Sequence, residues 1–199
     1  MSFSFASDYI IEDAIVQLKP LHENHFKSLL DISNEPNIWD YSHIKGNGSL
    51  NLMEYIKSTI QARKDKKEYP FLVVDKRTNQ AAGCTRFCDI DLTLNNTRLG
   101  YTWYGKRFQG TGLNKHCKYL LFDFAFGTME MERIGMGSYV ENKRSIAAMK
   151  SVGCTEEGRF RQALPSPSGR GRSDVVLLSI LKEEWITHKK EELRLKLIR

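Results

Sequence analysis

Two glycines at the start of a helix are the residues of this chain best suited to chemistry. Gly110 and Gly112 follow an aromatic and aliphatic stretch typical of a buried strand, and they precede apolar residues at helical spacing. The first N–H groups of a helix lack carbonyl partners, and the helix dipole adds positive charge there. This position predicts an anion site, usually for phosphate, although a short glycine motif standing alone more often marks a plain turn.

The spacing around these glycines excludes two other phosphate motifs. A dinucleotide fingerprint reads G-x-G-x-x-G, and a P-loop reads G-x-x-x-x-G-K-[ST]. The chain instead carries R-x-x-G-x-G, with Arg107 at its start and Gln109 directly before the first glycine. This pattern resembles the pyrophosphate-binding loop of the GNAT-type N-acetyltransferases, which reads Q/R-x-x-G-x-G/A.

A second motif lies further along the chain. Asn142 and Ser145 form N-x-x-S, and Gly153 begins a stretch that ends in Glu157-Gly158. This order looks like N-x-x-S…G-F-x-x-E-G, the signature of the GNAT subgroup that includes the ribosomal-protein-alanine N-terminal acetyltransferases. Cys154 stands where that signature has an aromatic residue, which we interpret as a change in the core. Two motifs in the family's order indicate the family more strongly than either motif alone.

The resemblance implies how coenzyme A is held. Backbone N–H groups from Gln109 to Asn114 would bind its pyrophosphate, and the end of the preceding strand would pair through its backbone with the pantetheine arm. Asn142 would hydrogen-bond that arm, and Ser145 would lie near the sulfur. A helix cap with a serine in the first turn explains these two residues without a ligand, and the two roles are compatible. The expected cofactor-binding residues are Trp103, Tyr104, Arg107, Gln109, Gly110, Thr111, Gly112, Leu113, Asn114, Asn142 and Ser145.

Acetyl transfer to an amine also needs proton transfer. Many acetyltransferases place a tyrosine as general acid on the helix after the motif asparagine, where this chain has Met149 and Lys150. Ser145 is therefore our candidate catalytic residue, as a proton donor acting directly or through water. The general base stays open, because Arg98 and the segment 161–164 occupy positions where the family carries a carboxylate. Bulk water, Glu141 or a carboxylate from the first helices are the alternatives.

Hydrophobic periodicity predicts the elements that position these residues. Three strands form an antiparallel meander that leads into residues 107–114, which we call the glycine loop. A helix, a strand and a second helix follow, and then a final pair of strands. The acetyltransferase resemblance implies an α/β (α+β mixed) fold, with a mixed, mostly antiparallel sheet that is flanked by helices and splays to admit a cofactor. We predict one N-acetyltransferase domain over residues 1–199. The predicted strands span 14–18, 71–74, 81–91, 99–104, 134–140, 155–163 and 174–181, and the later helices span 112–127, 142–153 and 183–197.

Two earlier helices are predicted between the first two strands. Phe26 and Leu29 face inward from the first, which by resemblance forms the acceptor-binding side together with the second. Ser49 is the expected N-terminal cap of the second helix, and the charged segment 63–67 is its expected solvated end.

Composition limits the possible partners. The net charge of +6 and the sequence pI near 9.1 favour anionic ligands without identifying any. The sequence shows neither an apolar run long enough to span a bilayer nor a signal-peptide pattern, so we expect a cytoplasmic protein without a membrane partner. The four cysteines form no C-x-x-C pair, which suits free thiols in a reducing compartment and favours no metal site.

Our first hypothesis is an N-acetyltransferase that moves an acetyl group from acetyl-CoA to a primary amine by direct transfer in a ternary complex, leaving coenzyme A as product. Subgroup resemblance suggests a peptide or protein N-terminus as acceptor, and a small amine is not excluded. The alternative is an acyl-CoA-binding sensor or interaction protein that has lost turnover. A nucleic-acid binder that uses the arginines of segment 159–172 is a third, weaker hypothesis, since no base-reading module is present. The C-terminal helix, with Trp185 and several leucines, either forms a homodimer surface or packs back on its own sheet.

Overall fold

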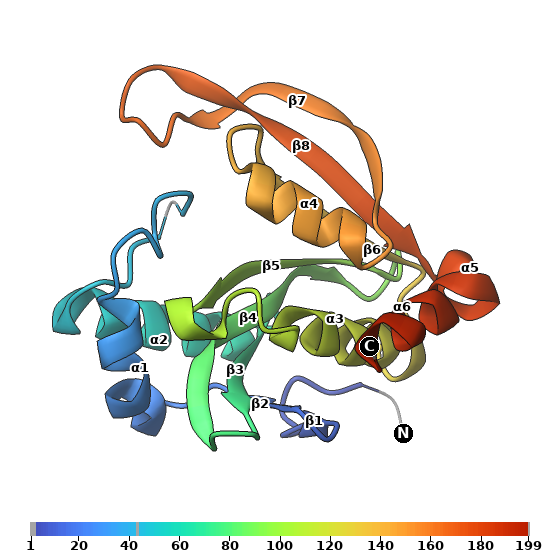
Figure 1. The fold of residues 1–199 in the computed structure, drawn as a ribbon, viewed down its shortest axis with the longest axis horizontal. Coiled ribbons are helices and arrows are strands. Elements are labelled where there is room, and N and C mark those ends of the chain that lie inside the picture. The colour runs from blue at the N-terminus through green and yellow to red at the C-terminus, as the bar shows by residue number, and fades with distance from the viewer. Residues whose placement is uncertain (1–2, 43, 199) are drawn as a thin grey trace.

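The computed structural model describes residues 3–42 and 44–198 of the chain (Figure 1). Within these ranges, eight strands form one sheet in the order β1-β2-β3-β4-β5-β6-β8-β7. Neighbouring strands are antiparallel, except that β5 and β6 are parallel. The strands are β1 (Ile11–Glu12), β2 (Val16–Pro20), β3 (Tyr69–Asp75), β4 (Gln80–Asp91), β5 (Asn96–Tyr104), β6 (Arg133–Tyr139), β7 (Thr155–Pro165) and β8 (Arg172–Leu181).

Helices cover both faces of this sheet. Successive side chains of a strand point to opposite faces, and two neighbours on β5 contact different helices. Trp103 Nε1 donates a hydrogen bond to the hydroxyl of Tyr55 on α2, whereas the Tyr104 hydroxyl donates to Asn114 Oδ1 on α3. The helices are α1 (Phe26–Ser33), α2 (Ser49–Lys64), α3 (Leu113–Gly127), α4 (Lys143–Ser151), α5 (Lys182–Glu184) and α6 (Lys190–Leu197), with 3₁₀ turns at Glu23–His25 and Lys106–Phe108 and a π-helical turn at Trp185–Lys189. No helix in the described ranges is long and apolar enough to cross a membrane.

The predicted meander of three strands into the glycine loop is confirmed as β3, β4 and β5. A register shift interrupts the β3–β4 pairing next to Gly83. A Cβ atom on Gly83 would lie 1.9 Å from the carbonyl oxygen of Trp103, so this close approach of two backbones requires glycine. Phe71 and Phe87 then bring β3 and β4 against Phe124 of α3, which joins the strands and the helix into one core.

The sheet divides between β5 and β6. Their pairing is limited to the register from Asn96↔Arg133 to Arg98↔Gly135, after which the strands separate (Figure 1). Within the described ranges, the segment from Leu99 to Tyr104 therefore has β4 on one side and no strand on the other. β6 instead stays paired with β8 along its whole length. This is the splayed, mostly antiparallel sheet that the sequence predicts.

The C-terminal helices fold back onto the chain. Trp185 is 1% exposed, and its ring lies against Tyr119, Phe122 and Phe126 of α3. Leu193 is buried as well. The packing surface is thus α3 and not the face of the sheet. The predicted helix over 183–197 contains the π-helical turn, which no regular helical periodicity could indicate.

One prediction for α2 is wrong, and a second holds only for residues 64–67, which are exposed. Ser49 is the first residue of α2 and makes no capping hydrogen bond; the N-cap is Gly48, whose φ of +85° suits glycine. The end of the helix is not fully solvated, because Arg63 donates hydrogen bonds to the carbonyl oxygen of Phe5 and to Asp8. The charge pattern at the end of α2 cannot indicate that the N-terminal segment with Phe5 and Asp8 lies beside it in the fold.

Candidate active site

The glycine loop has the geometry of an anion site. Gly110 and Gly112 have φ values of +75° and +83°, and Gly112 is the N-cap of α3. Among the described residues, the backbone N–H groups of 110–114 donate no hydrogen bond. A Cβ atom built on either glycine would meet nothing within 4 Å. Unpaired N–H groups around left-handed glycines at a helix start are the backbone arrangement that binds anions in proteins generally.

Side chains around the loop hold its shape. Gln109 Nε2 donates to the carbonyl oxygen of Tyr104 at 2.8 Å, and Thr111 Oγ1 donates to that of Phe108 at 2.8 Å. Phe108 is buried beneath the loop, and the exposed Arg107 guanidinium lies over its ring. These contacts therefore fix the loop on its core side, and the space next to Gly110 and Gly112 is open.

Some predicted cofactor-binding residues can offer only backbone groups. Leu113 is fully buried, and Trp103 is turned into the core, where its ring lies 5.0 Å from that of Trp39. The Tyr104 hydroxyl is engaged with Asn114, and burial raises the pKa of Tyr104 well above its ordinary value. These side chains support the strand and the loop.

Two basic side chains that sequence reasoning missed flank the loop. Arg77, in the β3–β4 turn, lies 3.4 Å from both the carbonyl oxygen and the hydroxyl of Thr111. Asp75 fixes it through two hydrogen bonds of 2.9 and 2.6 Å, and Arg77 in turn lowers the pKa of Asp75. Arg144 of α4 reaches Gln109 from the other side. No spacing rule could have connected these two arginines with the loop, because Arg77 is in a strand turn and Arg144 is on a helix, both distant from the loop in sequence.

The predicted cap of α4 is confirmed. Asn142 Oδ1 accepts a hydrogen bond from the backbone N–H of Ser145 at 3.1 Å. Among the described residues, the Asn142 side-chain nitrogen and the Ser145 hydroxyl make no hydrogen bond, so both remain able to bind a ligand. Met149 is buried, and Lys150 is exposed and paired with Glu156 at 2.7 Å.

A β-bulge lies on β5 beside the split in the sheet. Cys84 pairs with Trp103 and Arg86 with Gly100, so one residue of β4 opposes two of β5, Tyr101 and Thr102. Tyr101 has a φ of +50°. The buried Arg86 guanidinium lies 3.6 Å from the centre of the Tyr101 ring. The bulge thus redirects the backbone of β5 where the two halves of the sheet diverge.

The carboxylates in the second motif and directly before it differ in availability. Glu157, from the second motif, binds Arg133 at 2.6 and 2.5 Å and Ser179 at 2.8 Å. Arg133 thereby lowers the pKa of Glu157 to about 2, which makes it a poor proton acceptor at neutral pH. Glu141 is exposed and accepts from Ser173 at 3.0 Å. Glu157 therefore stabilises the β7–β8 pair and is unsuited to be the base.

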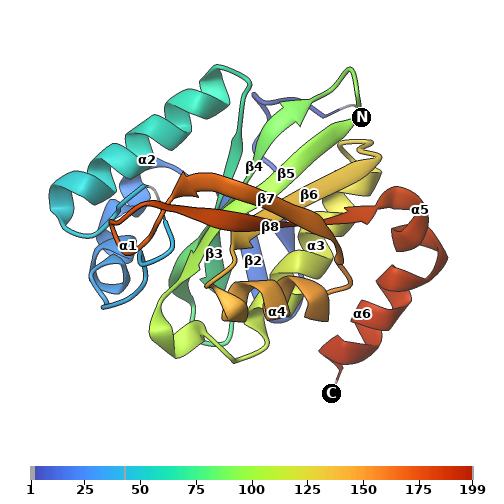
Figure 2. The same cartoon turned by 90° about the horizontal axis from the view of Figure 1, so that it is seen from above.

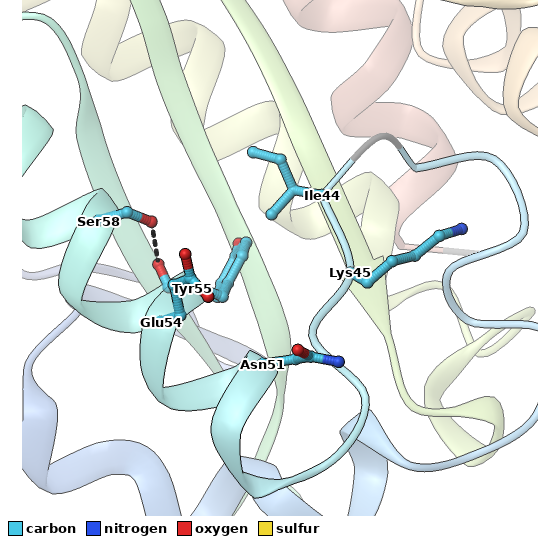
Figure 3. Close-up of a pocket in the computed structure, with 6 residues that line it drawn as sticks. All are labelled: Ile44, Lys45, Asn51, Glu54, Tyr55 and Ser58. Carbon is cyan, nitrogen blue, oxygen red and sulfur yellow. Dashed lines mark hydrogen bonds between the residues drawn. The ribbon is translucent and has the colours of Figure 1, made fainter. Parts of the chain in front are cut away.

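A pocket lies between α2 and the loop before it. Its volume is about 390 Å³. Glu54, Tyr55 and Ser58 of α2 lie across it from Ile44, while the side chain of Lys45 in the loop extends away from α2 (Figure 3) and donates to the carbonyl oxygen of Trp39. Tyr55 is buried, and its hydroxyl accepts a hydrogen bond from Trp103 on β5. Tyr55 therefore connects this pocket to the strand at the split. Asn51 completes the lining.

The β7–β8 hairpin extends over the sheet toward the loop that carries Tyr41 (Figures 1 and 2). The rings of Tyr41 and Tyr139 lie 6.3 Å apart, and the Tyr139 hydroxyl donates to the carbonyl oxygen of Pro165. Of the arginines on this hairpin, Arg172 bonds the backbone of Gln162 at 2.6 Å and so stabilises the hairpin itself. Tyr41 and Tyr139, which are far apart in sequence, thus form a border between the hairpin and this loop.

Known proteins share both the sequence and the fold. The protein named "Putative ribosomal N-acetyltransferase YdaF" of Bacillus subtilis (strain 168) is 32% identical over 97 residues. That match covers 49% of this chain and 51% of YdaF, so it spans about half the length of this curated relative.

Solved structures extend the fold match to almost the whole chain. A GCN5-related N-acetyltransferase from Brucella melitensis superimposes with a TM-score of 0.87 at 21% identity, over 98% of this chain and 87% of that one. RimL, described as a ribosomal L7/L12 alpha-N-protein acetyltransferase in complex with coenzyme A, gives a TM-score of 0.77 at 19% identity, over 87% and 98%. At these identities the likeness shows the fold alone.

The family model described as acetyltransferase (GNAT) domain matches residues 16–155, from β2 to the start of β7. This range includes the glycine loop, the split between β5 and β6, and the α4 cap. The chain therefore belongs to the GNAT acetyltransferase family.

Proposed function

We propose that this chain is an N-acetyltransferase that moves an acetyl group from acetyl-CoA to a primary amine in a ternary complex. One observation carries the proposal: within residues 3–42 and 44–198, the edge of β5 beyond Arg98 pairs with no strand, and it leads directly into a loop whose N–H groups from 110 to 114 donate no hydrogen bond. The family uses acetyl-CoA, and these two features fit its pantetheine arm and its pyrophosphate. We propose one such domain over residues 1–199, in the cytoplasm.

The residues present fit the cofactor chemically. The loop offers N–H donors to phosphate oxygens, and Arg107, Arg77 and Arg144 add positive charge on three sides. Along the arm, β5 offers unpaired backbone groups between Leu99 and Tyr104. The free side-chain nitrogen of Asn142 is a donor for the amide oxygens of the arm.

When bound, acetyl-CoA supplies a thioester as the acetyl donor. The chain would then hold the acceptor amine against it, accept the proton that the amine loses, and supply one to the sulfur. Ser145 remains our candidate donor, because its hydroxyl makes no hydrogen bond to any residue that the structure describes. For the base, bulk water, Glu141 and Glu54 of α2 remain, and Glu54 has the advantage of lining the pocket.

We propose a peptide or protein N-terminus as acceptor, entering through the pocket beside α2. The ribosomal names of YdaF and RimL support this class. Glu54 gives the pocket a carboxylate for an incoming ammonium group, and Tyr55 links the pocket to β5. A small amine would need only the pocket, whereas a peptide would also contact the border formed by Tyr41 and Tyr139.

Calorimetric titration with acetyl-CoA and coenzyme A tests the site. We expect saturable binding by the wild type and its loss in Gly112→Val, because a branched side chain would project into the space above the loop. Gly169→Val is the matched control, since Gly169 also has a positive φ, +77°, and open space, but lies in the β7–β8 loop. Folded Gly112→Val that binds as tightly as Gly169→Val would refute the assignment.

Mass spectrometry after incubation with acetyl-CoA tests the acceptor. Peptides with a free N-terminus should gain an acetyl group, and the same peptides with a blocked N-terminus should not. Acetylation of small amines alone would replace the peptide proposal. Cofactor binding without any transfer would instead support the sensor.

A further inference from the structure

A lysine is buried at the split in the sheet. Lys118 of α3 is 5% exposed. Its Nζ donates a hydrogen bond to Thr102 Oγ1 at 3.2 Å, and Thr102 Oγ1 lies 2.7 Å from Thr85 Oγ1. An ammonium group has three donors, and Thr102 satisfies only one of them among the described residues.

This amine has no carboxylate partner in the described part of the chain. Burial lowers the pKa of Lys118 to about 8, while the thiols of Cys117 and Cys154 act in the opposite direction. The amine is therefore still mostly protonated at pH 7. A buried, unpaired cation destabilises a fold and is a frequent mark of a functional site.

The position of the amine is specific. Thr102 belongs to the bulge on the unpaired stretch of β5, whereas Cys154 lies between α4 and β7 on the other half of the sheet. The hydrogen bond to Thr102 places the amine of Lys118 at the bulge on β5. The glycine loop is at the far end of the same stretch of β5. A pantetheine arm running from the loop along β5 therefore brings its sulfur toward Lys118.

We propose that the ammonium group of Lys118 faces the sulfur of coenzyme A and stabilises its thiolate form. This inference rests on the proposed function. During transfer the acceptor nitrogen forms a bond to the acetyl carbon, the carbon–sulfur bond breaks, and its electron pair stays on sulfur. Lys118 stabilises that charge without giving up its proton, while the proton that the sulfur finally takes comes from Ser145 or water.

If Lys118 had only a structural role, replacing it would change the stability of the fold but not the ionisation of bound coenzyme A. Thr85 and Thr102 already hydrogen-bond each other, so the threonine pair does not need the amine. Methionine has a similar length and is apolar, so Lys118→Met should keep the fold and remove the buried charge. If Lys118 only supports the fold, the ionisation of bound coenzyme A will be the same with methionine.

The test is the pKa of the coenzyme A thiol when bound, measured by the ultraviolet absorbance of the thiolate across pH. Burial raises the pKa of the chain's own four cysteine thiols, so they contribute little in the useful range. With wild type, the bound thiol should have a pKa at least about one unit below that of free coenzyme A in the same buffer. With Lys118→Met it should return to the free value or rise above it.

Lys64→Met removes an exposed lysine of α2 and should behave as wild type. Lys118→Gln is the second variant, should Lys118→Met not fold. We also expect kcat to fall at least about tenfold in Lys118→Met with little change in KM, since one pKa unit corresponds to a factor of ten. Equal thiol pKa values in wild type and both Lys118 variants would overturn this inference alone. Failure of wild type to bind coenzyme A would overturn the proposed function as well.

Discussion

Arg144 of α4 donates a hydrogen bond from its Nη1 atom to the side-chain oxygen of Gln109, 2.5 Å away. Gln109 belongs to the glycine loop after β5, and α4 follows β6, so this contact joins the two halves that separate beyond Arg98. The guanidinium is exposed and beside the free N–H groups of the loop. It therefore lies where a pyrophosphate would carry its charge.

Arg144→Ala should weaken coenzyme A binding about tenfold, because a charge-assisted hydrogen bond to phosphate contributes roughly 1.5–3 kcal/mol. Calorimetry at fixed salt measures this. Lys143→Ala removes an equal charge from the neighbouring position of the same helix and should have a much smaller effect. Equal losses in the two variants would show that only the general charge of α4 matters.

Ser145→Ala should leave coenzyme A affinity unchanged and lower kcat by about 10²-fold, the usual contribution of a positioned proton donor. The reason is that the serine hydroxyl is free, while its backbone N–H, which the variant retains, makes the Asn142 cap. Steady-state kinetics with a peptide acceptor supply the measurement. A variant with wild-type kcat would remove Ser145 from the mechanism.

Glu157→Gln should reduce stability at pH 7 by less than about 1 kcal/mol, since the Glu157–Arg133 pair is more than a third exposed. Its folded pKa, about 2, lies below the ordinary glutamate value of about 4.3. The contribution is therefore complete above the ordinary value and lost as pH falls toward the folded one.

Urea denaturation of the two proteins should accordingly show a stability difference at pH 7 that shrinks below about pH 4. Glu183 is exposed and forms no ion pair within the described ranges, so Glu183→Gln should match wild type at every pH. A difference for Glu157→Gln that grows on acidification would contradict the assigned sign.

Trp185→Ala should destabilise the fold by about 3–5 kcal/mol, the cost of removing a large buried aromatic side chain. Its ring fills the space between the π-helical turn and α3. Ile186 is adjacent and 68% exposed, so Ile186→Ala should change stability by at most about 0.5 kcal/mol. Chemical denaturation distinguishes the two, and a small loss for Trp185→Ala would mean that the C-terminal helices pack only loosely.

The sequence predicted elements where local patterns agree with tertiary packing. The meander into Gly110 and the Asn142 cap could be read because turn residues, caps and apolar spacing are local properties. Ser49 was misplaced because serine is also common in the first turn, and the glycine before it takes a backbone conformation that spacing does not reveal. The π-helical turn at Trp185 depends on packing against α3, which lies far away in sequence.

The site was predictable only in part, for the same reason. The motif residues were found from their spacing, yet Trp103 and Leu113 turn out to face the core. Arg77 and Lys118 carry no motif, and they reach the glycine loop and β5, respectively, only because a strand turn and a helix face are folded against these segments. A lysine at an apolar position of α3 was the available signal, and periodicity alone treats such a residue as an interruption.

The short pairing of β5 with β6 also affects how the folded chain opens locally and exchanges its amide hydrogens with solvent. Among the described residues, the parallel ladder between the two halves of the sheet is limited to residues 96–98, with one more backbone hydrogen bond from Glu132 to Asn95 beside it, whereas β6 and β8 pair from Arg133↔Leu181 to Tyr139↔Val175. Cooperative units of a fold tend to separate where few backbone bonds cross. The amides on the two sides of this junction should therefore exchange with solvent as two groups with different protection. A ligand that binds at the junction and contacts both halves of the sheet would give the amides of both halves similar protection from exchange.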